Sequence, residues 1–269
     1  MLDRTFIERL AILFEVIWYP LYLHKKIRFL LSIGDRVDEP FVGVAMSTNS
    51  KAAVLIPDVF FLRTRGYQAE RNAIDSFLAN QGATAKKPIA YWRGSLTGHR
   101  PWVNERWTNQ RILLCAFAKS NESKFDCKIT DWVVSQEESS FIDFIARSGI
   151  FLKGRRPFLE SLDFALQIDC DGMGNAWNGL FLKMYSGAPV LKIRSTSGLQ
   201  QWYYDRLTNM RNIVYVSSDL SNMTEQYDFL IADSGLMRSI GDEGRKLASE
   251  LKYAEEVALA QVALNVFAH

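Results

Sequence analysis

The chain has 269 residues, of which 48% are hydrophobic and 23% are charged, a composition typical of a folded globular protein and unlike that of disordered or collagen-like chains. Its 32 Lys and Arg residues nearly balance its 30 Asp and Glu residues, so the net charge of +2 gives no general attraction to nucleic acid. A chain of this length can form one large domain or two of medium size.

The N-terminal segment Leu10–Leu23 is apolar, but Glu15 and Pro20 interrupt it, and it is shorter than the ~20 residues that a membrane-spanning helix needs. It also lacks the basic start and the small-residue cleavage site of a secretory signal. We therefore expect a cytoplasmic protein. The basic segment 24–28 (HKKIR) leaves two interpretations open, a buried helix with a solvated basic end and a peripheral contact with the inner face of a membrane.

Short apolar runs rich in β-forming residues alternate with stretches of helical period, which predicts an α/β fold. The candidate strands are Phe29–Ile33, Phe41–Ala45, Ala53–Ile56, Ile89–Trp92, Phe125–Ile129, Phe164–Asp169, Val190–Ile193 and Ile213–Val216. Between the third and the fourth of these, the polar segment Gln81–Pro88 contains Gly and Pro and lacks a hydrophobic period, so it is the best candidate for a linker.

The second half of the chain shows the clearest alternation of strand and helix. A Gly-rich turn, Asp171–Gly174, follows a strand and should open a helix that ends at Gly187, before the next strand. This pattern predicts a β-α-β unit. Further on, Asn222 and Glu225 have the spacing of a capping box at the start of a helix that reaches Ile231.

A long helix is predicted at the end of the chain. Apolar residues recur there at spacings of three and four, at Leu247, Leu251, Ala254, Ala258 and Val262. Such a stripe is typical of an amphipathic helix that packs on a core, so we expect these five side chains to be buried.

Cysteine and histidine usage excludes several kinds of site. The cysteines Cys115, Cys127 and Cys170 are odd in number and lack C-x-x-C spacing, so neither a disulfide framework nor a zinc knuckle is indicated, which fits a reducing compartment. The three histidines lie far apart in the sequence, which excludes a His-rich metal site and an H-E-x-x-H metalloprotease. Catalysis by this chain would depend on carboxylates and arginines.

The segment YWRGSLTGHR, residues 91–100, is a β-type run that ends in Gly, Ser and Thr between arginines. Backbone N–H groups, hydroxyls and guanidiniums in such a turn can bind a phosphate. An arginine expected in the first turn of the following helix can add a further guanidinium. The alternative is an ordinary strand-to-helix turn with solvated arginines. The candidate anion ligands of this region are Arg93, Ser95, Thr97, Gly98, Arg100 and Arg111.

The segment QIDCDGMGNAW, residues 167–177, runs from a strand through a Gly-rich turn into a helix, which lets the backbone approach a diphosphate. It is not a P-loop, since no Lys-Ser or Lys-Thr follows the glycines, and it is only part of a dinucleotide-binding fingerprint. Asp169 and Asp171 form a D-x-D triplet that can hold Mg²⁺ or Mn²⁺, with a turn-capping role as the alternative. The candidate ligand residues are Asp171, Gly172, Gly174, Asn175, Ala176 and Trp177.

Asp35 follows the predicted strand Phe29–Ile33 at its carboxyl end. Ligand crevices of open α/β sheets lie at the carboxyl ends of strands, so this carboxylate can serve as a general base. The alternative is a turn-forming role, which Asp residues commonly have after strands.

Together these segments resemble glycosyltransferase family 90, which includes protein O-glucosyltransferases, capsule-associated transferases and bacterial lipopolysaccharide core transferases. The matching segments, in the family's order from about Phe29 onward, are LLSIGD, LIPDVFFLRTRGY, YWRGSLTG, QIDCDGMGNAWNGLFLKMYSGAPVLK and SDLSNMTEQYDFLIADSGLMRSIGDEGRKLA. The resemblance implies a GT-B architecture, in which two Rossmann-like domains face each other across a cleft and a C-terminal helix crosses back. The corresponding divisions are an acceptor-side domain (1–88), a nucleotide-sugar domain (89–245) and the returning helix (246–269).

The resemblance further implies an inverting, metal-independent transfer of a hexose from a UDP-sugar to a hydroxyl of a glycan or glycolipid, with no cofactor. Asp35 matches the family's base, with Asp38 as the second choice, and the arginine and glycine segments match its donor contacts. Guanidiniums and oriented N–H groups can stabilise the departing UDP without a metal. Eukaryotic relatives carry an arginine in the helix after the glycine turn, and here Lys183 is the candidate substitute.

The bacterial character of the motifs and the basic, apolar N-terminus favour a lipopolysaccharide core or another surface polysaccharide as the acceptor. Two other functions stay open. One is a non-catalytic nucleotide-sugar or glycan binding protein of the same fold, and the other is a Mg-dependent nucleotide phosphoryl transferase that uses the D-x-D triplet. Which of Arg100, Arg106 and Arg111 contacts the diphosphate also stays open.

Overall fold

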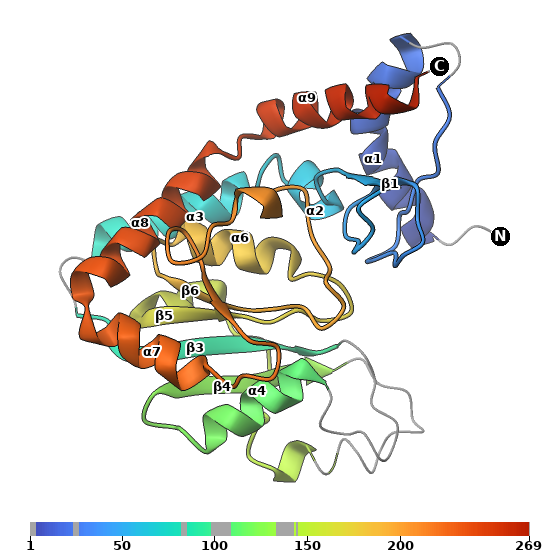
Figure 1. The fold of residues 1–269 in the computed structure, drawn as a ribbon. Helices are drawn as coiled ribbons and strands as arrows, with labels where there is room; N and C mark the ends of the chain where they lie inside the picture. The colour runs from blue at the N-terminus through green and yellow to red at the C-terminus, as the bar shows by residue number, and fades with distance from the viewer. Residues whose placement is uncertain are drawn as a thin grey trace.

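The computed structural model describes residues 4–23, 27–81, 85–97, 109–132, 143 and 145–268. Within these residues, the centre of the molecule is a parallel sheet of five strands in the order β4-β3-β5-β6-β7 (Figure 1). The strands are β3 (Lys87–Leu96), β4 (Phe125–Trp132), β5 (Phe164–Asp169), β6 (Val190–Ile193) and β7 (Val214–Val216). The predicted α/β class with parallel strands is confirmed.

Helices cover both faces of this sheet, as the right-handed connections between parallel strands require. On one face lie α4 (Gln110–Lys119) and α7 (Met223–Ala232), and on the other lie α3 (Gln68–Gln81) and α6 (Trp177–Tyr185) (Figure 1). Helix α8 (Ser234–Glu250) contributes to both cores, through Ile240 to the first and through Ala248 to the second. The middle strand β5 is therefore buried along its whole length. Because β3 leads to β4 on one side and β5 leads to β6 on the other, the connections diverge between β3 and β5, where open α/β sheets form a ligand crevice.

The N-terminal residues form a small unit beside the sheet. It contains α1 (Arg4–Leu23), the parallel pair β1 (Gly43–Ala45) and β2 (Ala53–Leu55), and α2 (Val59–Arg63). The C-terminal helix α9 (Tyr253–Ala263) extends away from the sheet and packs against α1 (Figure 1). Side chains from both ends of the chain share one core, which includes Leu13, Val16, Met46, Val257 and Leu264. The predicted return of the C-terminal helix is confirmed.

Short 3-10 helices complete the described structure, namely η2 (Phe158–Asp163), η3 (Tyr204–Arg206) and η4 (Leu264–Phe267). The glycine turn is followed by α6 as predicted, and Gly187 stops that helix with a positive φ of 76°. The capping box predicted at the start of α7 is wrong, because the side chain of Asn222 does not cap the helix. Asn222 precedes the helix, but its side-chain oxygen accepts a hydrogen bond from the Ser217 N–H at 2.8 Å instead of capping the helix.

The predicted strand Phe29–Ile33 is wrong. Only Leu31 pairs there, through a single bridge to Val44 in β1. The two segments approach closely at Gly43, where an added Cβ would overlap the backbone of the neighbouring segment. A single close crossing does not make a ladder, and the predicted strand Phe41–Ala45 accordingly begins only at Gly43.

The last predicted helix is two helices. α8 ends at Glu250 and α9 begins at Tyr253. Between them the carbonyl of Leu251 accepts a hydrogen bond of 2.8 Å from the guanidinium of Arg71 in α3, a tertiary contact that an unbroken helix would not offer in this form. The break changes the buried face of α9, so Val257 and Ala260 are buried, as is Leu264 at the start of η4. The predicted core residues Ala254, Ala258 and Val262 are exposed.

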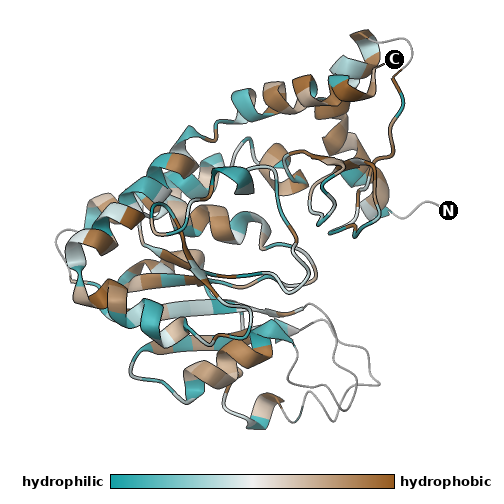
Figure 2. Cartoon of the chain, viewed as in Figure 1, coloured by the Kyte–Doolittle hydropathy of each residue, from teal (hydrophilic) through white to brown (hydrophobic). Residues whose placement is uncertain are grey.

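Helix α1 buries one face and exposes the other (Figure 2). Leu13 and Val16 are fully buried, whereas Phe14 is 55% exposed, Trp18 is 44% exposed and Tyr22 is 77% exposed. Among the described residues, no helix combines the length and the hydropathy needed to cross a membrane.

Candidate functional site

A crevice lies where the carboxyl ends of β3, β5 and β6 meet. Thr97 follows β3, Asp171 and Gly172 follow β5, and the polar run Ser195–Ser197 follows β6, and all of them line the crevice. Arg36 of the N-terminal unit lines the crevice from the other side. The crevice therefore lies between the sheet and the N-terminal unit, at the point where the strand connections diverge.

Arg111 joins the ends of β3 and β5. It lies in the first turn of α4, as predicted, and Asn109 caps that turn by accepting a hydrogen bond from the Arg111 N–H at 3.0 Å. The guanidinium donates to the Ser95 carbonyl at 2.6 Å, to Thr97 Oγ1 at 2.8 Å and to the carbonyls of Cys170–Asp171 at 3.3 and 3.1 Å. A guanidinium has five N–H groups, so the described residues leave one of them unused. Arg111 is mainly a brace of the crevice wall.

Gly172 and Gly174 permit close contacts with other segments. An added Cβ on Gly172 would overlap Thr97 Oγ1 and lie 2.7 Å from the guanidinium of Arg111. An added Cβ on Gly174 would overlap the carbonyl oxygen of Asp35. The turn is therefore glycine-rich because two separate segments pack directly on its backbone.

The carboxylates of the D-x-D triplet are buried and paired with lysines. Lys183 donates to Asp169 Oδ1 at 2.8 Å, and Lys192 donates to Asp169 Oδ2 at 2.7 Å and to Asp171 Oδ1 at 2.5 Å. The remaining oxygen, Asp171 Oδ2, accepts from Asn175 Nδ2 at 3.1 Å. Burial by itself raises the pKa of Asp169, but the two lysines together lower that pKa to about 2. All four carboxylate oxygens thus have protein partners, and the charges balance.

The three residues at the start of α6 turn toward protein partners. Ser47 Oγ of the N-terminal unit donates to Asn175 Oδ1 at 2.8 Å. The Ala176 N–H donates to a carboxylate oxygen of the turn at 3.3 Å. The ring of Trp177 packs against that of Phe60 in α2, with 6.3 Å between centroids. These contacts dock the N-terminal unit on the glycine turn, and the role of the three residues in donor binding stays a prediction.

Asp35 lies in the N-terminal unit, next in sequence to Arg36, which lines the crevice. Its Oδ1 accepts from Arg9 at 2.7 Å, and its side chain is 41% exposed, with no partner for Oδ2 among the described residues. Asp38, the second candidate base, pairs with Arg36 at 2.8 Å and has a side chain that is 42% exposed. The backbone carbonyl of Asp35 lies against Gly174, so Asp35 packs on the glycine turn through its backbone, and its role as the base stays a prediction.

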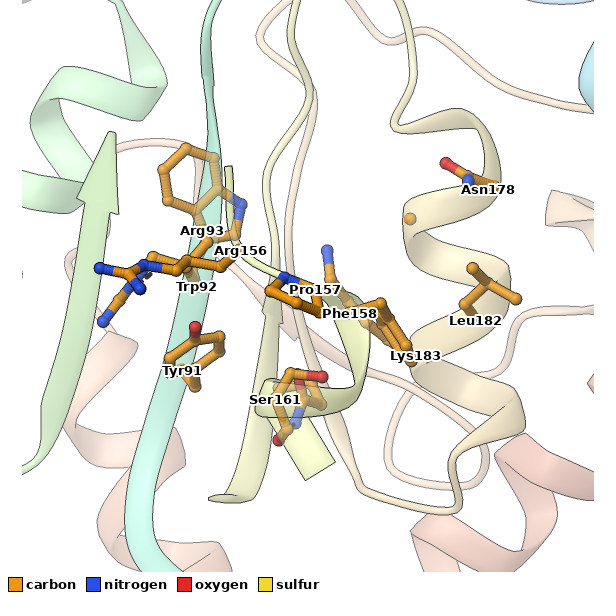
Figure 3. Close-up of a pocket in the computed structure, with 12 residues that line it drawn as sticks. Tyr91, Trp92, Arg93, Arg156, Pro157, Phe158, Ser161, Asn178, Leu182 and Lys183 are labelled. Carbon is orange, nitrogen blue, oxygen red and sulfur yellow. Dashed lines mark hydrogen bonds between the residues drawn. The ribbon is translucent and has the colours of Figure 1, made fainter. Parts of the chain in front are cut away.

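Arg93 does not line this crevice. Its guanidinium bonds to Asp126 Oδ2 of β4 at 2.7 Å and lies over the ring of Tyr91, 4.3 Å from its centroid. Arg93 lines a separate hollow (Figure 3), which shares no lining residue with the crevice among the described residues. Ser95 contributes its carbonyl to the arginine brace. Three further candidates lie outside the described residues, namely Gly98, Arg100 and Arg106.

No protein-family model matches the sequence, and no curated protein matches it. One similar solved structure is Anabaena Alr3699/HepE in complex with UDP and glucose (12% identity, 70% of this chain and 50% of that chain, TM-score 0.45). Another is a glycosyltransferase from Rickettsia africae (9% identity, 83% and 62%, TM-score 0.48). The C-terminal domain of the group 1 glycosyl transferase LpcC from Francisella tularensis is also similar (12% identity, 65% and 91%, TM-score 0.41). The chain thus spans about half of the length of the HepE chain.

Sequence reasoning missed Arg36 and Ser195–Ser197. The sequence did carry a signal for Ser195–Ser197, because this polar run follows the predicted strand Val190–Ile193. The polar segments in residues 91–100 and 167–177 follow their predicted strands in the same way. Arg36 had no such signal. It faces the crevice only because the N-terminal unit docks there, with its guanidinium 3.5 Å from the carbonyl of Met173.

Proposed function

We propose that the chain is a glycosyltransferase that moves a hexose from a UDP-sugar to a hydroxyl of a glycan or glycolipid. The observation that supports this most is that Thr97, Asp171 and Gly172 line one crevice although they lie far apart in the sequence, and that the backbone of Asp35 packs on Gly174 of the same glycine turn. These are segments on which the resemblance to glycosyltransferase family 90 rests. Convergence at the carboxyl ends of parallel strands is expected of residues that share a ligand.

The mouth of the crevice is the proposed place for the diphosphate of the donor. Arg36 supplies a guanidinium there, and Thr97 and Ser195–Ser197 supply hydroxyl and N–H groups. UDP gains negative charge as its bond to the sugar breaks, so donors aimed at that charge lower the barrier. In this proposal Arg111, Asn175, Gly172 and Gly174 hold the wall of the site in place. Arg93 does not contact the donor, because it lines a separate hollow.

Asp35 is the proposed general base. Arg9 holds one carboxylate oxygen, and the other is available to take the proton of the acceptor hydroxyl. As that oxygen attacks the anomeric carbon, the bond from this carbon to UDP breaks on the opposite side, which inverts the configuration. The proton remains on Asp35 and UDP leaves with the electron pair.

The proposed transfer needs no metal. In support, the oxygens of Asp169 and Asp171 are all bonded to protein groups, and Lys192 bridges the two carboxylates. A divalent cation at the D-x-D triplet would have to displace that lysine. The competing function, a Mg-dependent phosphoryl transferase, requires this displacement and predicts that a chelator abolishes activity.

For the acceptor we propose a lipopolysaccharide core or another surface polysaccharide, reached at the inner face of a membrane. The exposed aromatic side chains of α1, among them Trp18 and Tyr22, support this proposal. The basic segment 24–28 follows them directly in the sequence. Apolar and basic groups together are typical of a peripheral contact with anionic lipid.

Donor binding is tested by calorimetric titration of the full chain with UDP, UDP-glucose, UDP-galactose and UDP-xylose, each with and without a chelator. We expect micromolar binding of UDP that survives the chelator, and the series ranks the donors. Absence of binding, or binding only with Mg²⁺, would overturn the proposal.

The base is tested with Asp35→Asn against the matched variant Asp38→Asn, since both aspartates are similarly exposed and each is paired with an arginine. Loss of a general base is expected to lower the transfer rate by roughly 10²- to 10⁴-fold in Asp35→Asn and to leave UDP binding intact. Asp38→Asn is expected to retain most of its activity. The reverse order would move the base to Asp38, and a wild-type chain with no turnover would indicate a binding protein.

A further inference from the structure

Arg9 lies on the face of α1 that packs into the protein. It precedes Leu13 by four residues and Val16 by seven, so the three side chains share one face of the helix. Leu13 and Val16 are fully buried in the core that α1 shares with α9, and the side chain of Arg9 is only 23% exposed. A charge on the inner face of an apolar helix is costly unless protein groups satisfy it, so the bonding partners of Arg9 indicate its role.

The guanidinium of Arg9 bonds to one loop at two points. Nη1 donates to the carbonyl of Ile33 at 2.9 Å, and Nη2 donates to Asp35 Oδ1 at 2.7 Å. The nitrogens of a planar guanidinium have a fixed separation, so two bonds define both the distance and the orientation of what they hold. These two bonds, called the Arg9 clamp below, fix the backbone of the loop and the carboxylate of Asp35 relative to α1.

The loop that Arg9 holds has few other attachments. A bond of 2.8 Å from the Ser32 N–H to β1 precedes it, and a bond of 3.1 Å from the Val37 N–H follows it. Between these two bonds, residues 33–36 make no backbone-to-backbone hydrogen bond within the part of the chain that the structure describes. The direction of the Asp35 side chain is therefore not set by a strand ladder, and the clamp is the contact that sets it.

We propose that Arg9 is a positioning residue for the transfer reaction. This inference rests on the proposed function, in which Asp35 is the general base. With Oδ1 held by Arg9, Oδ2 has one defined direction from which to take the proton of the acceptor hydroxyl. The acceptor oxygen then bonds to the anomeric carbon, and UDP leaves with the electron pair of the broken bond. A displacement of about 1 Å at a group of this kind can lower a rate by about 10²-fold.

The clamp acts on the rate of the chemical step and not on donor binding. Arg36, the residue of the loop that lines the crevice, has attachments of its own, at 2.8 Å to Asp38 Oδ2 and at 3.5 Å to the carbonyl of Met173. Both attachments persist when Arg9 is removed. We therefore expect kcat to fall in Arg9→Ala, while the KM of the donor and the Kd of UDP stay near their wild-type values.

Arg9→Ala and Arg4→Ala form a matched pair. Both arginines belong to α1 and each is paired with a carboxylate, but Arg4 is 92% exposed and its partner is Glu8 of the same helix, at 2.9 Å. We expect Arg9→Ala to lower kcat by about 10- to 100-fold and Arg4→Ala to change it by less than about twofold. An unchanged kcat in Arg9→Ala, beside a strongly lowered kcat in Asp35→Asn, would overturn the inference alone.

Arg9→Lys separates orientation from charge. Lysine keeps the positive charge but lacks the planar fork that makes both bonds, so this variant is expected to recover only part of the lost rate. Full recovery would show that a positive charge suffices, and it would overturn the positioning role.

A double-mutant cycle separates positioning from a general effect on the fold. If Arg9 acts through Asp35, Arg9→Ala adds little further loss of rate in a chain that already carries Asp35→Asn. An equal loss in both backgrounds would mean that Arg9 acts independently of Asp35, and it would overturn the inference. Thermal unfolding and UDP titration of each variant check that the chain is folded and binds the donor.

Amide hydrogen exchange tests the clamp without a transfer assay. The bonded amides of Ser32 and Val37 flank the loop, and we expect both to exchange faster in Arg9→Ala and at the wild-type rate in Arg4→Ala. Unchanged exchange in Arg9→Ala would overturn the inference whatever the chain catalyses. Faster exchange in that variant, together with a wild-type chain that transfers no sugar, would overturn the proposed function and leave the clamp as a structural contact.

Discussion

Two buried carboxylates, Asp58 and Asp169, are stabilised in opposite ways. Asp58 caps α2 and accepts hydrogen bonds from the N–H groups of Phe60 and Phe61 and from the hydroxyl of Tyr67, all uncharged donors. Burial raises the pKa of Asp58 to about 6, and these donors offset only part of the rise. Asp169 is equally buried, but its lysine partners keep its pKa low. The same side chain therefore responds to pH in different ranges at the two positions.

Asp58 predicts a stability that falls as the pH rises. Because its pKa is raised in the folded state, the folded chain holds the proton more tightly than the unfolded one, so this contribution is full below about pH 4 and is lost as the pH rises through about 6. Two pKa units correspond to about 3 kcal/mol. We expect the free energy of unfolding of the wild type, relative to Asp58→Asn, to fall by about that amount between pH 4 and pH 7 in urea titrations. A constant difference across this range would show that Asp58 has an ordinary pKa.

At the scale of elements, close backbone contacts decide how the segments dock. The glycine turn before α6 touches both the arginine brace and the loop that carries Asp35. On the far side of the same helix, α8 approaches the turn at Gly187, where an added Cβ on Gly241 would overlap the Gly187 carbonyl. Glycine at these points sets the distance between elements, and a side chain would push them apart.

Gly174→Ala and Gly179→Ala test this with the same chemical change. At Gly174 the new methyl group would overlap the backbone oxygen of Asp35, whereas at Gly179, within α6, the nearest atoms are at 3.6 Å, an ordinary contact. We expect Gly174→Ala to destabilise the fold by roughly 1–3 kcal/mol in urea unfolding. Gly179→Ala is expected to be neutral or to stabilise by up to about 1 kcal/mol, because alanine favours the helix. A neutral result at Gly174 would mean that the Asp35 loop does not rest on the turn.

At the scale of the whole molecule, the two ends of the chain close on each other. Besides the core that α1 and α9 share, Glu256 of α9 is 3% exposed and forms two bonds with Arg206, at 2.7 and 3.1 Å, which attach α9 to the segment after β6. The N-terminal unit is therefore held both at the glycine turn and by the C-terminal helix. The placement of Asp35 depends on both attachments.

Leu264→Ala and Val262→Ala test the role of the C-terminal helix. Leu264 is fully buried in the shared core, whereas Val262 is 66% exposed, although the sequence stripe predicted Val262 to be buried. We expect Leu264→Ala to cost about 2–5 kcal/mol and to speed amide hydrogen exchange in α1, and Val262→Ala to change stability by less than about 0.5 kcal/mol. A larger loss of stability in Val262→Ala would indicate that Val262 is buried, as the unbroken helix predicted from the sequence requires.

Some features follow from local sequence alone. The strands Phe164–Asp169 and Val190–Ile193 are predicted to the residue, because buried parallel strands are continuous apolar runs with turn residues at their ends. Arg111 is likewise found in the first turn of a helix. The partner of Arg93 was not predictable, since Asp126 comes from another strand. The separate hollow that Arg93 lines was therefore missed as well.

The sequence by itself determined the α/β class, the order of most elements and the polar residues that end the strands, because periodicity and turn chemistry act over a few neighbouring residues. Only the tertiary structure decided which of these residues meet. In the folded chain both carboxylates of the D-x-D triplet accept hydrogen bonds from lysines, one of which is Lys192 from the next strand. The last helix is interrupted at the point where Arg71 donates a hydrogen bond to the carbonyl of Leu251. Such partners lie many residues apart along the chain, and only the packing of the sheet and its helices brings them within hydrogen-bond distance.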